Sequence, residues 1–392
     1  MRIVQTVFGA FHHFELARQL NDRGHLQRIY STWPWARLKR EGLPKDKVGS
    51  FPWLHTPETL MYRFGLHSTS FTDDLGYANA LAFDWWTDRK LRSGPPPDAI
   101  IALSGSSLKT GRALQDRGTT FICDRGSSHQ RYQERIVSEE YKRWGADRPV
   151  SDPRDTVREE EIYAAADAIT VPSTFAARSF IESGISPGKI HILPYGVRLE
   201  RFHRTADPPA DRFQVLFAGA VGLRKGFPYL LQAFARLKHP NKSLRVVGAM
   251  QPELEPILKT LPLEHVEFIG AVPQDRLREL MSTSHVMVLP SIEEGLALVQ
   301  GQALACGCPV LASTNTGAED LFHDSVEGFI VPVGDVGALV DRMQRLADDP
   351  DLQAQMSAAA LERVRHLGGW NDYGDRWERL LYKLTGAPPP TK

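Results

Sequence analysis

Short apolar runs alternate along the chain with longer segments in which apolar residues recur every three or four positions. The short runs fit buried parallel strands, and the longer segments fit helices that cross between them. The pattern therefore predicts an α/β protein with parallel sheets. The strands predicted in the first half are Ile3–Phe8, Leu26–Tyr30, Ala99–Leu103, Thr120–Cys123, Ala168–Val171 and Ile190–Leu193. Those predicted in the second half are Gln214–Ala218, Leu244–Val247, Val266–Ile269, Val286–Leu289, Pro309–Ala312 and Phe329–Val331.

A polar, proline-containing stretch, His203–Arg212, separates the two series of strands and is typical of an interdomain linker. The length of 392 residues also favours two domains over a single core. We expect an N-terminal domain over residues 1–203 and a C-terminal domain over 204–369, with a helical tail over 370–392 that returns to the N-terminal domain. Two doubly wound lobes in series would enclose a cleft between the carboxyl ends of their strands, where such sheets bind ligands.

Residues 33–67 break the alternation, because aromatic residues stand there among proline, glycine and basic residues. This composition indicates an irregular insertion. Its tryptophan-rich basic part, Trp33–Arg40, would either touch a membrane interface that holds a lipid-linked acceptor or pack the loop onto the lobe. The aromatic residues of the insertion are Trp33, Trp35, Phe51, Trp53, Tyr62 and Phe64.

Composition and charge narrow the classes of partner. Lys+Arg and Asp+Glu both number 47, so no global field attracts nucleic acid. Three cysteines suit a reducing cytosol, and Cys306 and Cys308 lack the further ligands of a zinc site, so we expect them to be buried. The N-terminus indicates a strand rather than a signal peptide, and no apolar run is long enough to span a membrane. We expect a cytoplasmic protein or one peripheral to the inner membrane face.

The segment Val286–Ser313 carries the clearest chemical signal. A buried strand is followed by the acidic pair Glu293 and Glu294, then by Gly295 and a helix predicted from about Leu296 to Ala305. Gly295 lets a ligand approach the backbone, and the unpaired N–H groups of a helix start favour an anionic phosphate. Glu294 stands beside this place and is able to accept hydrogen bonds from sugar hydroxyls, whereas Glu293 is expected to face solvent or to stand behind it.

A second segment, Val215–Phe234, contains a strand, Gly219, a short loop and the sequence Arg224-Lys225-Gly226 at the start of a helix. When a sugar leaves a nucleoside diphosphate, negative charge grows on the phosphate. Cations and backbone donors fixed at that point stabilise the transition state without a metal ion. The segment therefore predicts a site for a diphosphate leaving group.

At these residues the chain resembles a retaining glycosyltransferase of family 4, with the GT-B fold of two Rossmann-like lobes. The similarity covers roughly residues 155–375, and the ordered set of motifs is more specific than any single one. In the C-terminal half the matching motifs are Gly219–Gly226, Pro290–Gly295, Ala303–Val310, Thr316-Gly317, Glu327–Phe329 and Trp370–Tyr373. In the N-terminal half they are Ala166–Ser173 and Leu193–Val197.

The resemblance implies a role for each matching position. Lys225 and Arg224 would hold the pyrophosphate in the loop that begins at Gly219. Glu294 would contact the donor sugar, and the catalytic candidates are His129, Lys225 and Glu294. Gln302 stands where the family usually has a second Glu that binds the ribose hydroxyls. The backbone that would touch the donor phosphates and sugar belongs to Gly295, Leu296, Ala297 and Leu298.

The chain departs from the family pattern in three places. Gln302 is neutral and loses a charge-assisted hydrogen bond to ribose. Ala220 stands where a phosphate-binding Arg is frequent, and Arg224 would replace that charge. Gly9–Phe14 replaces the usual glycine-rich loop after the first strand. These departures leave the identity of the donor open.

Two loops of the first lobe are predicted to face the cleft. In the loop Asp124–His129, one of Arg125, Ser127 and His129 would orient the acceptor hydroxyl or bind phosphate. The alternative is an exposed loop in which Ser127 or Ser128 caps the following helix. After the first strand, Gly9, His12 and His13 would contact donor or acceptor. Here the alternative is a solvated loop, or histidines that bond only to backbone groups.

Together these features predict transfer of a sugar from a nucleoside diphosphate sugar to a hydroxyl acceptor. The acceptor would be a glycan, a glycolipid or a small molecule, and the resemblance implies retention of anomeric configuration. No metal-binding Asp cluster is evident, so we expect neither a metal nor another cofactor. The alternatives are a nucleotide-sugar epimerase on the same fold and a donor-binding homologue without turnover.

Overall fold

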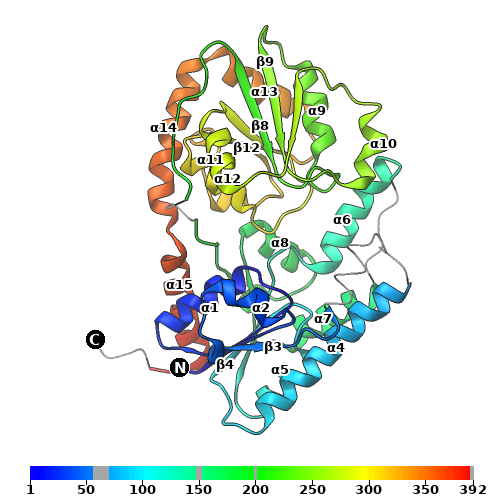
Figure 1. The fold of residues 1–392 in the computed structure, drawn as a ribbon, viewed down its shortest axis with the longest axis vertical. Helices are drawn as coiled ribbons and strands as arrows, with labels where there is room; N and C mark the ends of the chain where they lie inside the picture. Colours follow the sequence, from blue (N-terminus) through cyan, green and yellow to red (C-terminus); the bar gives the residue numbers. More distant parts are fainter. Residues whose placement is uncertain (56–69, 147–151, 198–200, 389–392) are drawn as a thin grey trace.

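The computed structural model of the protein describes residues 1–55, 70–146, 152–197 and 201–388. Its strands form two parallel sheets, one from each half of the chain, and each sheet belongs to a separate lobe (Figure 1). The predicted class of two doubly wound α/β lobes is confirmed. Tyr62 and Phe64 of the predicted insertion lie outside the described residues.

The N-terminal sheet has seven strands in the order β3-β2-β1-β4-β5-β6-β7. The order in which the strands follow the chain reverses at β1 and β4, so the crossover helices lie on both faces and the central strands are buried along almost their whole length. The strands are β1 Ile3–Val7, β2 Leu26–Ser31, β3 Val48–Ser50, β4 Ala99–Leu103, β5 Thr120–Asp124, β6 Ala168–Val171 and β7 Ile190–Ile192. The helices are α1 His12–Asp22, α2 Trp35–Leu38, α4 Ser70–Arg92, α5 Leu108–Gln115, α6 Gln130–Arg143, α7 Pro153–Ala165 and α8 Thr174–Glu182.

The C-terminal sheet has six strands in the order β10-β9-β8-β11-β12-β13. The strands are β8 Phe213–Ala218, β9 Lys242–Val247, β10 Val266–Gly270, β11 Val286–Leu289, β12 Val310–Ser313 and β13 Gly328–Val331. The helices are α9 Phe227–Arg236, α10 Glu255–Leu258, α11 Gln274–Ser282, α12 Leu298–Ala305, α13 Val336–Asp348, α14 Pro350–Leu367 and α15 Trp370–Thr385. All twelve predicted strands are present, with ends shifted by at most two residues.

One strand was not predicted. β3 is a three-residue strand at the edge of the N-terminal sheet, and its residues are only half buried. It pairs with β2 over Val48–Ser50 and contains Gly49, whose missing side chain makes room for the ring of Tyr30. So short a run, without a buried apolar face, gives no periodic signal in the sequence.

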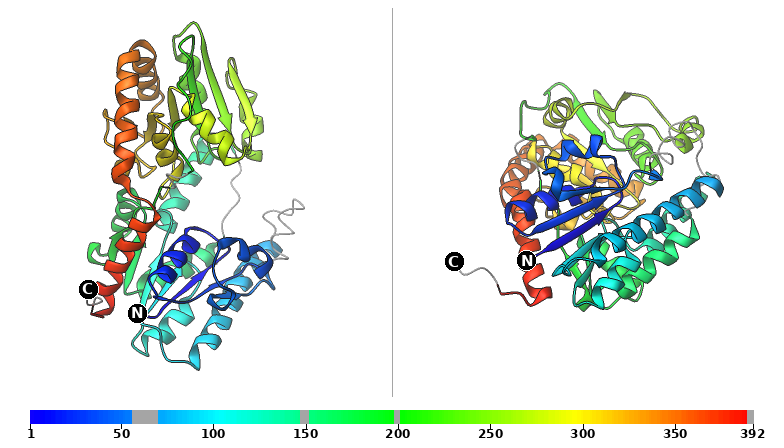
Figure 2. Two further views of the ribbon diagram at one scale, coloured as in Figure 1. Left: turned by 60° about the vertical axis from the view of Figure 1, so that its left-hand side comes forward. Right: turned by 60° about the horizontal axis from the view of Figure 1, so that its bottom comes forward.

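The two lobes are joined twice. The described residues from 201 to 212 run from one lobe to the other without forming a helix or a strand. At the other end of the chain, α14 stays with the C-terminal lobe and α15 descends beside α1 (Figures 1 and 2). Arg23 at the end of α1 donates to Asp375 at 2.5 Å, and Trp377 is fully buried against the N-terminal lobe. The C-terminal helix is therefore part of the packing of the first lobe.

Two further findings concern the cysteines and the length of the apolar helices. Cys123, Cys306 and Cys308 are free thiols and are buried, as expected for residues of the core. Within the described parts of the chain, no helix combines the length and apolar character needed to cross a bilayer.

Candidate active site

The loop after β8 delivers two cations to the inter-lobe side of the C-terminal sheet. Gly219 has a φ of +151°, and its carbonyl oxygen would lie 1.7 Å from a β-carbon on Gly248, which therefore has no room for a side chain. Gly226 begins α9 with a φ of +64°, and a β-carbon there would meet the carbonyl oxygen of Pro290 at 1.9 Å. The glycines thus fix the turn, and the side chain of Lys225 lies against Gly219.

The loop after β11 brings an acidic residue to the same place. The N–H of Glu294 donates to the carbonyl of Asn315 at 2.9 Å, and that of Ala297 donates to Thr316 at 3.2 Å. Helix α12 then begins at Leu298, two residues later than predicted, and no side chain among the described residues caps it. The N–H of Gln300 donates to the carbonyl of Ala297 at 3.0 Å, and an uncapped helix start of this kind favours an anion.

The predicted donor residues meet where these two loops face each other. Lys225 and Glu294 form a close ion pair, and the Nη1 atom of Arg224 lies 3.1 Å from Oε1 of Glu294. Burial opposes the charge on Arg224, but Glu294 and Glu293 outweigh it and raise the pKa of the guanidinium above its ordinary value. Two cations and a carboxylate therefore converge beside the start of α12.

A cavity of about 390 Å³ lies between these charges and the apolar edge of the lobe. Its volume falls within the range of small-molecule sites, and its charged end and apolar walls suit a nucleotide. It is lined by Ala218, Gly219, Lys225, Val247, Gly248, Ala271, Val272, Leu277, Glu294, Leu296, Ala297, Leu298 and Val299. A second cavity of about 310 Å³ continues from Leu298 to Gln302 and is closed by Ala10, Phe11 and His12 of the first lobe. Gln302 and Glu294 thus line neighbouring cavities that share Leu298.

Glu293 does not face solvent, and that part of the prediction is wrong. Its side chain is fully buried, and its Oε1 atom accepts hydrogen bonds from the hydroxyls of Ser127 at 2.6 Å and Ser128 at 2.8 Å. Its Oε2 atom accepts from the side-chain amide of Gln133 at 2.7 Å. The adjacent Glu294 turns toward Lys225 instead, because neighbouring residues of an extended loop point in different directions.

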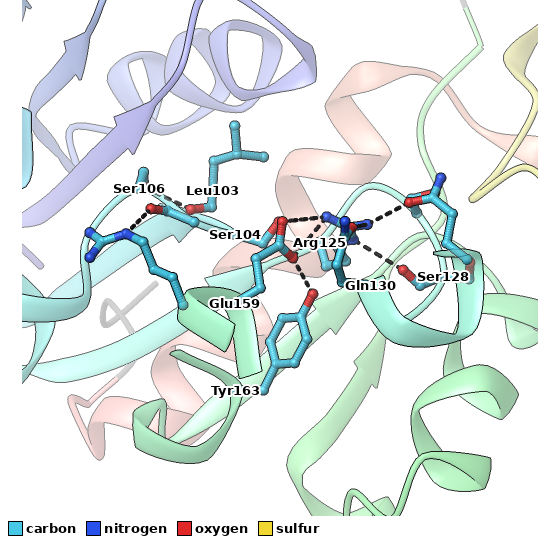
Figure 3. Close-up of polar contacts among 12 residues, drawn as sticks. Leu103, Ser104, Ser106, Arg125, Ser128, Gln130, Glu159 and Tyr163 are labelled. Atoms are coloured by element: carbon cyan, nitrogen blue, oxygen red, sulfur yellow. Dashed lines mark hydrogen bonds and ion pairs between the residues drawn. The ribbon is translucent and has the colours of Figure 1, made fainter. Parts of the chain in front are cut away.

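The loop of the first lobe that follows β5 lies against this acidic pair. Ser127 reaches Glu293, and helix α6 begins at Gln130 after the N-cap residue His129, without a side-chain cap among the described residues, so the alternative of a serine cap is wrong. Arg125 is buried rather than open to the cleft, and it binds both carboxylate oxygens of Glu159 at 2.8 Å (Figure 3). Arg125 therefore stabilises this loop through contacts inside the N-terminal lobe.

His129 is placed away from Lys225 and Glu294. Its ring packs between Tyr163 and Phe180, with both ring centroids 5.0 Å away, and its Nδ1 atom has no hydrogen-bond partner among the described residues. Burial lowers the pKa of His129 to about 4. The surroundings are those of a packed aromatic side chain.

His12 is the imidazole that reaches the cleft. Its Nε2 atom lies 2.8 Å from Oδ2 of Asp124, its ring packs on Tyr195, and it lines the cavity shared with Gln302. Burial opposes ionisation of Asp124, but His12, His13 and the hydroxyl of Thr170 hold its pKa below the ordinary value. Asp124 was not predicted as a site residue, although its place at the carboxyl end of β5 was a signal for it.

His13 stands behind His12 and is fully buried, so burial lowers its pKa to about 3. Its Nε2 atom lies 3.1 Å from the same oxygen of Asp124. Within the described residues, these three side chains form the group whose ligand atoms are close enough to hold a metal ion, within 4.8 Å of one another. The contacts of Asp124 with both imidazoles already account for that closeness.

The tryptophan-rich stretch Trp33–Arg40 packs on the first lobe. Trp33 donates to His55 at 2.8 Å, and the guanidinium of Arg37 lies 3.4 Å above its ring. Trp33 also lies against Gly9, which has a φ of +72° and no room for a larger residue. Outward-facing aromatic residues occur elsewhere, with Trp53 the most exposed of them at 74%. The packing alternative describes this stretch, and membrane contact stays a prediction.

Comparison with known structures agrees with the two-lobed architecture. Sucrose-phosphate synthase from Thermosynechococcus elongatus is 20% identical and superposes with a TM-score of 0.74 over 99% of this chain and 100% of that one. HepE from Anabaena, solved in complex with UDP-glucose, is 16% identical, with a TM-score of 0.67 over 98% and 100% of the two chains. The chain thus has the GT-B fold of two facing Rossmann-like lobes.

Two sequence families match consecutive parts of the chain. A family described as "Glycosyl transferase 4-like domain" matches residues 12–196, and "Glycosyl transferases group 1" matches residues 200–363. The chain belongs to the glycosyltransferases of family 4. It is 29% identical to a D-inositol 3-phosphate glycosyltransferase of Thermomonospora curvata, over 58% of this chain and 59% of that protein. It is also 28% identical to an alpha-D-kanosaminyltransferase of Streptomyces kanamyceticus, over 38% and 40% of the two chains. The matches therefore span little more than half the length of these relatives, or less.

Proposed function

We propose that the protein transfers a hexose from a nucleoside diphosphate sugar to a hydroxyl of a glycan, glycolipid or small molecule, with retention of configuration and without a metal ion. The observation that carries the proposal is the convergence of Lys225, Arg224 and Glu294 at the uncapped start of α12. Relatives named for sugar transfer and the solved complex of HepE with UDP-glucose support the choice of donor.

Binding of the donor exchanges the ion-pair partners of Lys225 and Arg224. In the ligand-free protein Glu294 neutralises Lys225. A bound diphosphate takes over Lys225 and Arg224, and Glu294 is then released to accept hydrogen bonds from the sugar hydroxyls. As the bond from the anomeric carbon to the phosphate oxygen breaks, these cations and the amides of α12 hold the growing negative charge. Fixed cations of this kind supply the charge stabilisation that a metal ion would otherwise provide.

Retention follows if the acceptor attacks from the side on which the phosphate leaves. A new bond then forms from the acceptor oxygen to the anomeric carbon, and the acceptor proton passes to the departing phosphate oxygen. The imidazole near this path is His12, because His129 is packed inside the lobe. We assign His12, oriented by Asp124, to a hydrogen bond with a ligand hydroxyl.

A binding and product screen tests the proposal. UDP-, GDP-, ADP- and dTDP-sugars are titrated by calorimetry, and products are identified with and without candidate acceptors. We expect one of these donors to bind, and Lys225→Ala to lower its affinity about a hundredfold, because a charge-assisted phosphate contact contributes about 1.5–3 kcal/mol. Lys259→Ala, an exposed lysine of the same lobe, is the matched control.

Each other outcome has its own meaning. Failure of the folded protein to bind any of these donors at millimolar concentration would refute the proposal. An epimeric nucleotide sugar formed without acceptor would identify an epimerase instead. Binding without transfer or hydrolysis for every acceptor class would identify a donor-binding homologue.

A further inference from the structure

The carboxylate of Glu293, a residue of the C-terminal lobe, is bound by side chains of the N-terminal lobe. It belongs to the loop after β11 in the C-terminal lobe, yet three hydrogen-bond donors of its shell come from Ser127, Ser128 and Gln133 of the N-terminal lobe. The backbone N–H of Ser128 adds a longer contact at 3.2 Å. A fully buried carboxylate is costly unless it is satisfied, and here the groups that satisfy it are assembled only when the lobes meet.

The side chains of the N-terminal lobe that bind Glu293 are held in place by further hydrogen bonds within that lobe. Gln133 accepts a hydrogen bond from Arg125 at 2.9 Å through its Oε1 atom, so its NH₂ group must face Glu293. Arg125 is itself held by Glu159, Gln130, Ser104 and the carbonyl of Ser128, as Figure 3 shows. The orientation of the amide is therefore set from within the lobe before the carboxylate of Glu293 arrives.

The other side of Glu293 leads directly to the donor site. Arg224 donates to the backbone carbonyl of Glu293 at 2.7 Å, and the same Nη1 atom lies 3.5 Å from its carboxylate and 3.1 Å from Glu294. Glu293 thus joins two groups of charges. Gln133 links it to Arg125 and Glu159 of the N-terminal lobe. Arg224 links it to Glu294 of the donor site. Burial opposes ionisation of Glu293, but Arg224 and the three side-chain donors keep its pKa below the ordinary value.

The backbone next to Glu293 is equally close to the first lobe. A β-carbon on Gly295 would lie 2.0 Å from the carbonyl oxygen of Gly126, and the hydroxyl of Ser173 donates to the carbonyl of Gly295 at 2.5 Å. Other contacts between the lobes include the more exposed ion pair of Arg178 with Glu319 at 3.5 Å. Glu293 is thus one of the inter-lobe contacts that adjoin the donor-binding residues, and its carboxylate is fully buried there.

We propose that Glu293 is a positioning residue, which clamps the donor loop of the C-terminal lobe onto the Gly126–Ser128 turn and so sets the closed geometry required for transfer. The clamp itself is independent of the ligand, whereas its effect on turnover rests on the proposed function. Because the donor cavity is lined by the C-terminal lobe alone, loss of the clamp should spare donor binding and impair transfer to an acceptor held by the other lobe.

The first measurement is the distance between the lobes without ligand. Spin labels on Arg112→Cys and Lys259→Cys, both exposed, report it by pulsed electron resonance, and the three native cysteines are buried and do not compete. Glu293→Gln should broaden the distribution toward longer distances, because the neutral amide keeps only one of the two acceptor oxygens and its NH₂ group must face either the NH₂ group of Gln133 or the donors of Ser127 and Ser128. Ser127→Ala with Ser128→Ala removes the other half of the clamp and should give the same result. Glu319→Gln, at the peripheral ion pair, should match the wild type.

The second measurement separates binding from turnover. In Glu293→Gln, the affinities for UDP, GDP, ADP and dTDP should stay within about twofold of the wild type, while kcat falls at least about tenfold. An unchanged distance distribution would overturn the clamp, as would an unchanged kcat or a parallel loss of nucleotide affinity and thermal stability. If no nucleoside diphosphate binds the wild type, the proposed function fails, and the ligand-free distances still decide whether the clamp exists.

Discussion

Gln302 differs in charge from the residue that its position in the family leads one to expect. It lies on α12 in the cavity that continues from the donor pocket, together with Leu298, and it is only partly buried. An amide and a carboxylate both accept hydrogen bonds from ribose hydroxyls, but bonds to a charged acceptor are about twice as strong. The neutral residue therefore weakens the ribose contact without removing it.

Gln302→Glu should tighten binding of the donor about tenfold, since replacing a neutral hydrogen bond by a charge-assisted one gains about 1–1.5 kcal/mol. Calorimetric titration with the donor found in the screen measures the change. Gln274→Glu, on α11 in the same cavity, adds the same charge away from α12 and controls for a general electrostatic effect. Equal affinities for Gln302→Glu and the wild type would contradict the ribose assignment.

Local sequence was enough to predict that two side chains of the proposed donor site come together. Lys225 and Glu294 were predicted from a loop after a strand, and the structure brings their side chains together. Glu293 takes the second of the two places expected for it, behind the site, but its hydrogen-bond partners could not be predicted, because they lie on the other lobe, 160 or more positions away along the chain. A catalytic role for His129 stays a prediction, and the packing of its ring on Phe180 was not foreseen, because the neighbours of His129 in the sequence do not reveal that helix. Local patterns carry no record of such distant partners.

At the scale of elements, the donor loop and the turn after β5 meet backbone to backbone. Gly295 is buried, and its Cα faces the carbonyl of Gly126 and the Cα of Ser127. The alternation of apolar runs predicted all the strands that flank these loops, because buried parallel strands leave a strong pattern. It did not predict β3, nor how closely the loops would approach each other. The need for glycine at 295 comes from the opposite lobe.

Gly295→Ala should separate the two loops, because a β-carbon would lie 2.0 Å from backbone that has no flexible end to move. Overpacking of this kind costs about 1–3 kcal/mol, and a displacement of about 1 Å near reacting groups lowers rates by about a hundredfold. We expect a loss of kcat together with a longer inter-lobe distance. Gly188→Ala, where a β-carbon would meet nothing within 4 Å, is the matched control. Normal turnover in Gly295→Ala would show that the loops separate without consequence.

At the scale of the whole molecule, stability depends on buried histidines that sit in the cores beside the cleft. Burial lowers the pKa of His13 to about 3 and that of His129 to about 4. Both groups stay neutral in the folded protein and bind protons in the unfolded chain below a pKa of about 6.5, so acid favours unfolding. Asp155 works in the opposite direction, because burial raises its pKa to about 6 and the folded state takes up a proton. Burial also raises the pKa of Glu140 and Asp320, but the four histidines with lowered pKa values, His13, His129, His191 and His285, outnumber these three carboxyls, so stability should fall as the pH drops below 6.5.

His129→Phe removes one of these protons and fills the space between Tyr163 and Phe180 with another ring. Between pH 6.5 and 5 the wild type should lose about 2 kcal/mol of unfolding free energy through this histidine alone, at about 1.4 kcal/mol per pH unit. The variant should therefore show a shallower fall in urea denaturation across that range. His366→Gln, whose side chain is 68% exposed, is the control and should follow the wild type. Because the ring is packed away from Lys225 and Glu294, transfer by His129→Phe should persist at pH 7. Complete loss of transfer in a folded His129→Phe protein would instead return this histidine to the catalytic group.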